Sequence, residues 1–287
     1  MTASNPQSGA WRTWTKERLE REYSPSSTVP DIGAEIERYV RDSAAARAAC
    51  PPATVRYGVD PSATIDLFRP PANGPHPTLI YVHGGYWQEL SKNESAFMVP
   101  ALLAHGVAVA VVDYQLAPVA RLPSIIAQCS AACRHLVTEA GPLSLDRARL
   151  VVSGSSAGGH LAAMVLGEVA GLAGGILVSG VYDLVPLVGT YVNDALGLDE
   201  PAAERVSPMG RSMAARVALV LAVGEIETGE FHRQTAEFAE RKRGQGHPVA
   251  ELRAAGRHHF DLPYDLGNAE TPLGQLTLGL TLTGGLA

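Results

Sequence analysis

The stretch LVVSGSSAGGHLAAM, residues 150–164, decides the fold class. It begins with a short apolar run, passes through the small residues at 154–158 and continues with residues suited to a helix. A continuous apolar run without alternation is typical of a strand that is buried on both faces of a sheet. The sequence therefore predicts a buried strand, a sharp turn and a helix, in that order.

Other short β-type runs surround this unit along most of the chain. The expected strands are residues 54–57, 64–68, 78–82, 107–112, 150–152, 176–179, 217–223 and 249–252. Helical patterns separate several of them, and the clearest cover residues 32–49 and 122–140. This alternation indicates an α/β fold with a mostly parallel central sheet of about eight strands and helices on both faces.

Length and composition favour one domain over residues 1–287. The chain has 46% hydrophobic and 18% charged residues, which is enough apolar surface for a sizeable core and excludes a disordered chain. No change in composition divides it. We expect an N-terminal helical segment over residues 1–50 and a cap-like insertion at 181–211, because that irregular region is longer than an ordinary connection.

The net charge of the chain and its few cysteines indicate which partners and which cellular compartment to expect. With 23 basic and 29 acidic side chains, the net charge is −6, and nucleic acid or an anionic membrane surface is a poor match. Residues 1–20 lack the apolar core of a secretory signal. Cys50, Cys129 and Cys133 are too few for a disulfide scaffold and lack further ligands at metal-binding spacing. We expect a cytoplasmic protein with free thiols, no metal and no cofactor.

Residues 154–158 fit the pattern G-x-S-x-G with Ser156 at the centre. In this pattern a sharp strand-to-helix turn exposes the serine hydroxyl, and glycine neighbours allow the backbone to bend tightly. The helix N-terminus that follows favours negative charge developing beside the serine. Ser156 is therefore the predicted nucleophile.

The sequence HGGYW at residues 83–87 follows an earlier strand. Gly84 and Gly85 leave their amide groups unobstructed, and the amide of Ala157 can converge with them. Such amides form an oxyanion hole, which stabilises the negative charge of a tetrahedral intermediate. A turn with a core tryptophan would be the purely structural interpretation of these residues.

A serine nucleophile of this type needs an acid and then a histidine later in the chain. Glu225, Glu227 and Glu230 all follow the expected strand 217–223, and we favour Glu227 because it lies at the loop tip. The candidates for the base are His247, His258 and His259. We favour His259, with His258 second, because this pair follows the last expected strand. His160 lies one turn into the nucleophile's helix, where it either lines the substrate pocket or packs against the helix.

These motifs resemble the kynurenine formamidase (arylformamidase) group of α/β-hydrolases, close to the hormone-sensitive-lipase-like esterases. The further matching stretches are LEREY at 19–23, SGVYDL at 179–184, Ser207-Pro208, ETGEFHRQ at 227–234 and HFDL at 259–262. The lipase-like esterases carry a third glycine where this chain has Tyr86. Better-known formamidases carry aspartate where this chain has Glu227.

The resemblance implies an α/β-hydrolase that cleaves N-formyl-L-kynurenine to kynurenine and formate through a formyl-serine. It places the nucleophile, acid and base at Ser156, Glu227 and His259, and the oxyanion amides at Gly84, Gly85 and Ala157. Tyr86 and Trp87 are the expected aromatic neighbours of the substrate ring.

Two other functions stay open at this point. One is a carboxylesterase for small acyl esters, or an arylformamidase of a specialised pathway. The other is a non-catalytic binding protein with the same fold. The expected partner is a small-molecule substrate, and a homodimer is one association state that the sequence leaves open.

Overall fold

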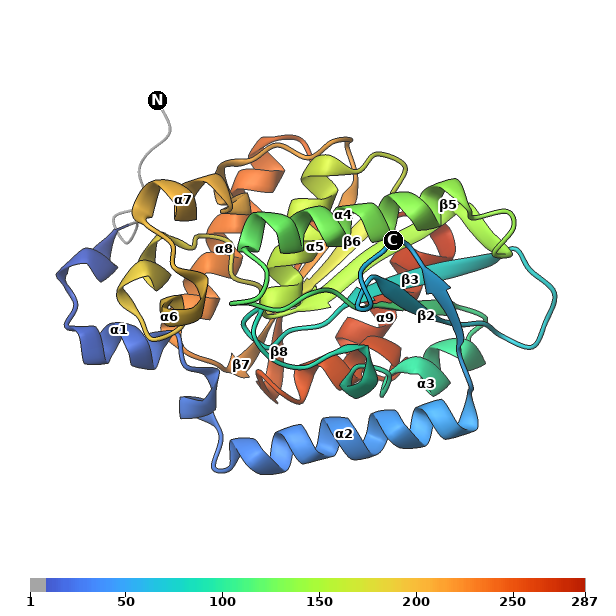
Figure 1. Cartoon of the computed structure of the whole chain (residues 1–287), viewed down its shortest axis with the longest axis horizontal. Coiled ribbons are helices and arrows are strands. Elements are labelled where there is room, and N and C mark those ends of the chain that lie inside the picture. Colours follow the sequence, from blue (N-terminus) through green and yellow to red (C-terminus); the bar gives the residue numbers. More distant parts are fainter. Residues whose placement is uncertain (1–8, 287) are drawn as a thin grey trace.

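Eight strands form one sheet at the centre of the computed structural model, which describes residues 9–286 (Figure 1). The strands are β1 (Ala53–Arg56), β2 (Thr64–Phe68), β3 (His76–Val82), β4 (Ala108–Val112), β5 (Leu145–Ser155), β6 (Gly174–Val178), β7 (Ala218–Ile226) and β8 (Val249–His258). Their order across the sheet is β1-β2-β4-β3-β5-β6-β7-β8. Strand β2 pairs antiparallel with both β1 and β4. All other neighbouring strands in the sheet pair parallel. The predicted mostly parallel sheet is confirmed.

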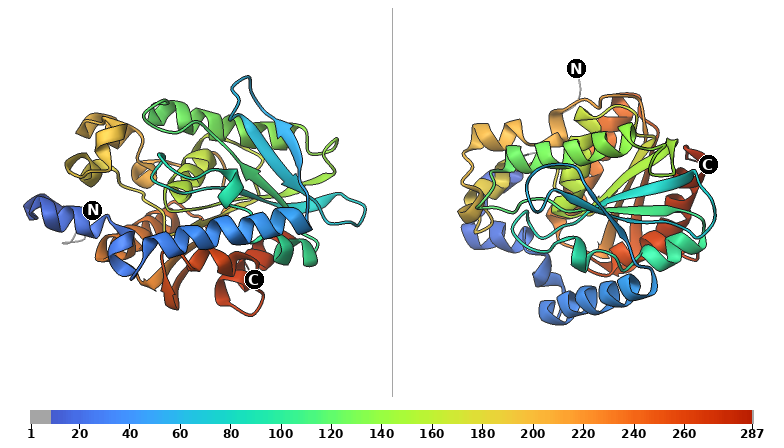
Figure 2. Two further views of the ribbon diagram at one scale, coloured as in Figure 1. Left: turned by 60° about the horizontal axis from the view of Figure 1, so that its bottom comes forward. Right: turned by 45° about the vertical axis from the view of Figure 1, so that its right-hand side comes forward.

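Helices cover both faces of this sheet, which explains why the strands are apolar without alternation. The α-helices are α1 (Lys16–Glu22), α2 (Ile32–Ala49), α3 (Val99–Ala104), α4 (Leu122–Thr138), α5 (Ala157–Glu168), α6 (Asn193–Leu196), α7 (Glu200–Arg205), α8 (Gly229–Gly244) and α9 (Pro272–Thr283). Helices α4, α5 and α8 contribute to one buried apolar cluster, and α2, α3 and α9 contribute to a second on the opposite face. Figures 1 and 2 show α2 running along the outside of the second face.

Shorter elements surround one edge of the sheet. The 3₁₀ helices are η1 (Ala10–Thr13), η2 (Pro25–Thr28), η3 (Lys92–Glu94), η4 (Val185–Gly189), η5 (Pro208–Gly210) and η6 (Leu262–Gly267). Residues 181–211, the expected cap-like insertion, contain η4, α6, α7 and η5. The expected N-terminal segment contains η1, α1, η2 and α2, and its residues 1–8 lie outside the described part of the chain. Figure 1 shows α1 and α6 close together beyond the end of the sheet.

Parallel pairing decides where functional side chains can meet. Because β3, β5, β6, β7 and β8 all run in the same direction, their carboxyl ends lie at one edge of the sheet. Ligand sites of open α/β sheets lie at that edge. Between residues 9 and 286, no helix has both the length and the apolar character needed to cross a membrane.

Candidate active site

Ser156 occupies the tight turn between β5 and α5. Its backbone has φ 59° and ψ −122°, a combination that non-glycine residues rarely adopt. The turn is held because the Ser156 amide donates to the carbonyl of Val178, with an N–O distance of 2.9 Å. A Cβ atom at Gly154 would lie 2.2 Å from the carbonyl oxygen of Gly158, so this turn requires glycine there. These are the features of the strained turn that the G-x-S-x-G pattern predicts.

The structure brings His259 and Glu227 into direct contact. Nδ1 of His259 donates to Oε2 of Glu227 at 2.7 Å, and both side chains are almost fully buried. The other carboxylate oxygen, Oε1, accepts from the Ser179 hydroxyl at 2.6 Å and from the Gly224 amide at 2.7 Å. With its proton on Nδ1, the neutral imidazole keeps Nε2 free to accept a proton.

The surroundings of Glu227 keep its carboxylate charged. Burial alone would raise the pKa of this group, but the electrostatic interaction with His259 and the hydrogen bonds from His259, Ser179 and Gly224 lower it below its usual value. A charged carboxylate can stabilise the imidazolium that forms when His259 accepts a proton.

The other candidate residues have different partners. Glu225 is exposed and accepts from the Gly256 amide, while Glu230 is buried and binds Arg233. Nδ1 of His247 lies 3.1 Å from the carbonyl of Val217 at the start of β7. His258 lies beside Glu35 and Asp261, with nitrogen–oxygen distances of 3.6 and 3.5 Å.

Ser156 and His259 line the same cavity, which has a volume of about 250 Å³. Among the described residues, no hydrogen bond joins the Ser156 hydroxyl to His259. Such bonds are often long in ligand-free sites and shorten when substrate is bound. The shared cavity is thus the observation that places this serine and this histidine together.

Three amide groups beside Ser156 are available to a ligand. In the described part of the chain, the amides of Gly84, Gly85 and Ala157 donate no hydrogen bond to another backbone group. Gly84 packs against the turn, since a Cβ atom placed on it would lie 3.3 Å from Cβ of Ser156. Unpaired amides in this position are what an oxyanion hole requires.

We expect Gly85→Ala to lower kcat by roughly 10²- to 10³-fold, the usual cost of losing one oxyanion donor. Gly85 has φ +94°, and an added Cβ would lie 2.2 Å from the Glu89 carbonyl oxygen, so the loop has to move. Gly106→Ala is the matched control, because Gly106 has φ +76° with no atom within 4 Å of the added Cβ. Both variants should lose stability in thermal unfolding. A Gly85→Ala enzyme with wild-type kcat would contradict the prediction.

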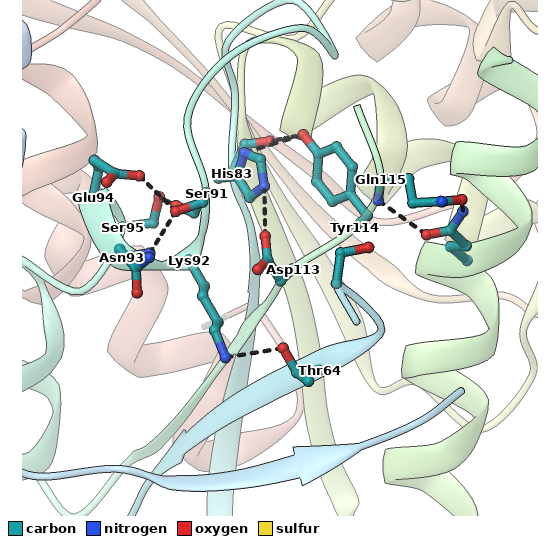
Figure 3. A network of polar contacts seen from close by, with 12 residues as sticks. Thr64, His83, Ser91, Lys92, Asn93, Glu94, Ser95, Asp113, Tyr114 and Gln115 are labelled. Atoms are coloured by element: carbon teal, nitrogen blue, oxygen red, sulfur yellow. Dashed lines mark hydrogen bonds and ion pairs between the residues drawn. The ribbon is translucent and has the colours of Figure 1, made fainter. Parts of the chain in front are cut away.

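His83 fixes the orientation of the peptide that follows it. Its Nδ1 lies 2.9 Å from the Gly84 carbonyl oxygen, and the Tyr114 hydroxyl donates to the His83 carbonyl at 2.8 Å. The two rings stack, and Nε2 of His83 lies 3.6 Å from Asp113 (Figure 3). Since the peptide unit is planar, a fixed Gly84 carbonyl also fixes the direction of the Gly85 amide.

Of the three predicted substrate-binding residues, only Tyr86 lines the cavity. Trp87 and His160 are both fully buried and are not among the residues that line it. The indole of Trp87 donates to Nδ1 of His160 at 3.2 Å, and Nε2 of His160 donates to the carbonyl of Val206 at 2.7 Å. The physical reason is that each polar nitrogen finds its partner inside the protein, which leaves both rings to packing.

This buried histidine should make stability depend on pH. Burial lowers the pKa of His160 to about 4 from an ordinary value of 6.5. Between these values the unfolded chain binds a proton that the folded chain does not, so the free energy of unfolding falls as the pH falls. The loss amounts to about 3 kcal/mol once the pH reaches 4. Above pH 6.5 the contribution vanishes.

Urea unfolding of the wild type and of His160→Gln checks this expectation. At neutral pH the variant should be less stable by about 1–3 kcal/mol, because buried hydrogen bonds are lost. The difference should shrink on acidification, since glutamine does not titrate. A difference that stays constant down to about pH 4.5 would show that His160 does not cause the effect.

Sequence reasoning missed the role of Tyr23, which connects the loops around the site. Its hydroxyl donates to Glu230 at 2.5 Å and accepts from Gln234 at 2.7 Å, and its carbonyl accepts from the Tyr86 hydroxyl. Gln234 in turn accepts from the amides of Tyr182 and Asp183. The segment after α1 therefore joins the loops that follow β3 and β6 to helix α8.

Sequence reasoning also missed part of the cavity wall. The N-terminal segment and the region 181–211 contribute mostly apolar side chains, namely Pro25, Ser26, Ile32, Ile36, Tyr39, Tyr191 and Val192. Phe97 and Phe260 add further aromatic surface. The spacing of Ile32, Ile36 and Tyr39 along one face of α2 was the signal that could have indicated this wall.

An eight-stranded, mostly parallel sheet with a G-x-S-x-G turn at its carboxyl edge defines the chain as an α/β-hydrolase. The BD-FAE family profile matches residues 65–171. A candidate thioesterase of Silicibacter sp. TM1040 superposes with a TM-score of 0.80 at 26% identity, covering 92% of this chain and 99% of that one.

Curated relatives identify the family within this class. Kynurenine formamidase of Danio rerio is 33% identical over 272 residues, which are 88% of this chain and 92% of that protein. Kynurenine formamidase of Salmo salar is 31% identical over 289 residues, 93% of this chain and 97% of that protein. The chain belongs to the kynurenine formamidase family.

Proposed function

We propose that this protein is a serine hydrolase that cleaves N-formyl-L-kynurenine to kynurenine and formate. The observation that carries the proposal is the cavity that Ser156 and His259 both line, with His259 bound to Glu227 and unpaired amides beside the serine. The family relatives bear the name of this activity. The three cysteines are free, which supports the further proposal of a reducing, cytoplasmic location.

The proposed reaction uses side-chain and backbone groups of the chain and one water molecule. His259 accepts the Ser156 proton as the hydroxyl oxygen attacks the formyl carbon, and the carbonyl electrons move to its oxygen. The amides of Gly84, Gly85 and Ala157 stabilise that oxyanion. When it collapses, the carbon–nitrogen bond breaks and His259 protonates the departing aryl amine. Water then attacks the formyl-serine by the same route and releases formate.

Glu227 has a positioning and electrostatic part in this scheme. Its carboxylate orients the imidazole through Nδ1 and stabilises the imidazolium in both steps. Tyr86, Tyr81 and Phe97 supply aromatic surface for the substrate ring along the cavity wall.

The test is a comparison of two substrates with purified protein. We expect kcat/KM for N-formyl-L-kynurenine to exceed that for p-nitrophenyl acetate by at least about tenfold, because enzymes express specificity as a ratio of kcat/KM. Formate and kynurenine should appear in equal amounts. Turnover of the ester without the formamide would favour the carboxylesterase instead. If neither compound reacts and no fluorophosphonate labels Ser156, the non-catalytic function becomes the better account.

A further inference from the structure

The charges on the cavity wall are all of one sign. Of the described residues that line the cavity, Glu89 and Glu94 are the two carboxylates, and no lysine or arginine lines it with them. Glu89 is exposed, whereas Glu94 is half-buried at the end of η3. The amino-acid end of N-formyl-L-kynurenine carries both an ammonium group and a carboxylate. The cavity wall offers a charged partner to the ammonium group alone.

Glu94 is held in place without being neutralised. The Ser91 hydroxyl donates to its Oε2 at 2.7 Å (Figure 3), and no cation of the described chain forms an ion pair with it. Oε1 accepts no hydrogen bond from the described residues, and it is not among the buried atoms that lack a partner. This oxygen therefore retains its capacity for a donor from a ligand.

The nearest lysine in sequence points elsewhere. Nζ of Lys92 donates to the hydroxyl of Thr64 and to the carboxylate of Asp66, both at 2.9 Å. Figure 3 shows its side chain extending toward β2, away from Glu94. Asp66 also binds Arg47, so the positive charges of this region are used to compensate a buried carboxylate. No cation of the described chain pairs with Glu94 beside the cavity.

We propose that Glu94 determines specificity by binding the ammonium group of an aryl formamide side chain. The substrate class is then aryl formamides that end in a primary amine, whether or not they also carry a carboxylate. A charge-assisted hydrogen bond in a partly buried position is stronger than a neutral one. A substrate carboxylate receives no charged partner here and is repelled by Glu94 and Glu89. This inference rests on the proposed function and names the group that selects its substrate.

Calorimetric titration with reaction products tests the inference without relying on turnover. Kynurenamine carries the amine only, and the deaminated analogue of kynurenine carries the carboxylate only. We expect the wild type to bind the amine at least about tenfold more tightly than the acid. Glu94→Gln should weaken amine binding by about 10- to 100-fold and leave acid binding unchanged or improved. Glu240→Gln is the matched control, since Glu240 is exposed on α8 and its loss changes the net charge equally.

Turnover of the matching formamides separates this inference from the proposed function. With N-formylkynurenamine, Glu94→Gln should raise KM and leave kcat near wild type, while neutral formanilide should react equally with both enzymes. Equal binding of amine and acid by the wild type, or an unchanged amine affinity in Glu94→Gln, would overturn the role of Glu94. If no formamide reacts but the amine still binds through Glu94, the proposed function fails and the ammonium site stands.

Discussion

Replacing Ser156 with alanine is expected to lower kcat for N-formyl-L-kynurenine by roughly 10⁴- to 10⁶-fold, the range found when a serine nucleophile is removed. The hydroxyl is the only group of the strained turn that can form the formyl intermediate. The unpaired amides and the cavity remain, so substrate binding and a small residual rate should persist. Steady-state kinetics with a sensitive formate assay measure the loss.

A control variant tests whether removing any serine hydroxyl lowers the rate or whether the effect is specific to Ser156. Ser124→Ala removes an exposed serine from the start of α4, far along the chain from the turn, and should keep wild-type rates. Mass spectrometry after fluorophosphonate treatment should find the label on Ser156 in the wild type and in Ser124→Ala. A Ser156→Ala enzyme that still forms an acyl or phosphonyl adduct would refute the assignment.

Glu227→Gln is expected to lower kcat by about 10⁴-fold, because the histidine adopts the wrong tautomer. One carboxylate oxygen of Glu227 accepts from the Gly224 amide, which can only donate, so an amide nitrogen cannot occupy that place. The new NH₂ group must then face His259 and donate to Nδ1. With Nδ1 accepting, Nε2 carries the proton and cannot take one from Ser156. The loss should appear in kcat with little change in KM.

Two further variants test the effect of losing a nearby negative charge and the effect of a shorter side chain at position 227. Glu225→Gln removes a neighbouring carboxylate that is exposed and bound only to the Gly256 amide, and it should retain most activity. Glu227→Asp keeps the charge but shortens the side chain, so activity should fall between the wild type and Glu227→Gln. If Glu225→Gln lost as much activity as Glu227→Gln, the acid would be misassigned.

The sheet could be predicted because its information is local. Each strand is a short apolar run, and the positions of all eight agree with the structure to within a few residues at most ends. The main differences are two strands that extend beyond their apolar runs. β5 begins at Leu145 because that residue pairs with His76 across an irregularity, and β8 continues to His258 because it pairs with Ile226 beyond another. Backbone pairing lengthened these strands where side-chain patterns gave no signal.

Some residues of the candidate site could likewise be predicted from local sequence, and others could not. Ser156, Glu227 and His259 stand at strand ends in a fixed chain order, so the sequence could indicate them. The general use of aromatic side chains in such clefts predicts Trp87 beside the substrate ring, yet nothing in the sequence tells whether its ring points into the cavity or into the core. The contacts of Tyr23 and the place of Glu94 on the cavity wall depend on segments that are distant in sequence, and no local pattern carries such information.

The link through Tyr23 sets an order of events during synthesis. Tyr23 leaves the ribosome early, but Glu230, its hydrogen-bond partner, follows 207 residues later. The turn at Ser156 can form once β3, β5 and β6 have been made, since these strands pair with one another. His259 and the closing contact both arrive near the end of translation. The proposed nucleophile is therefore made long before the proposed base, and hydrolysis by this pair requires contacts between segments from both ends of the described chain.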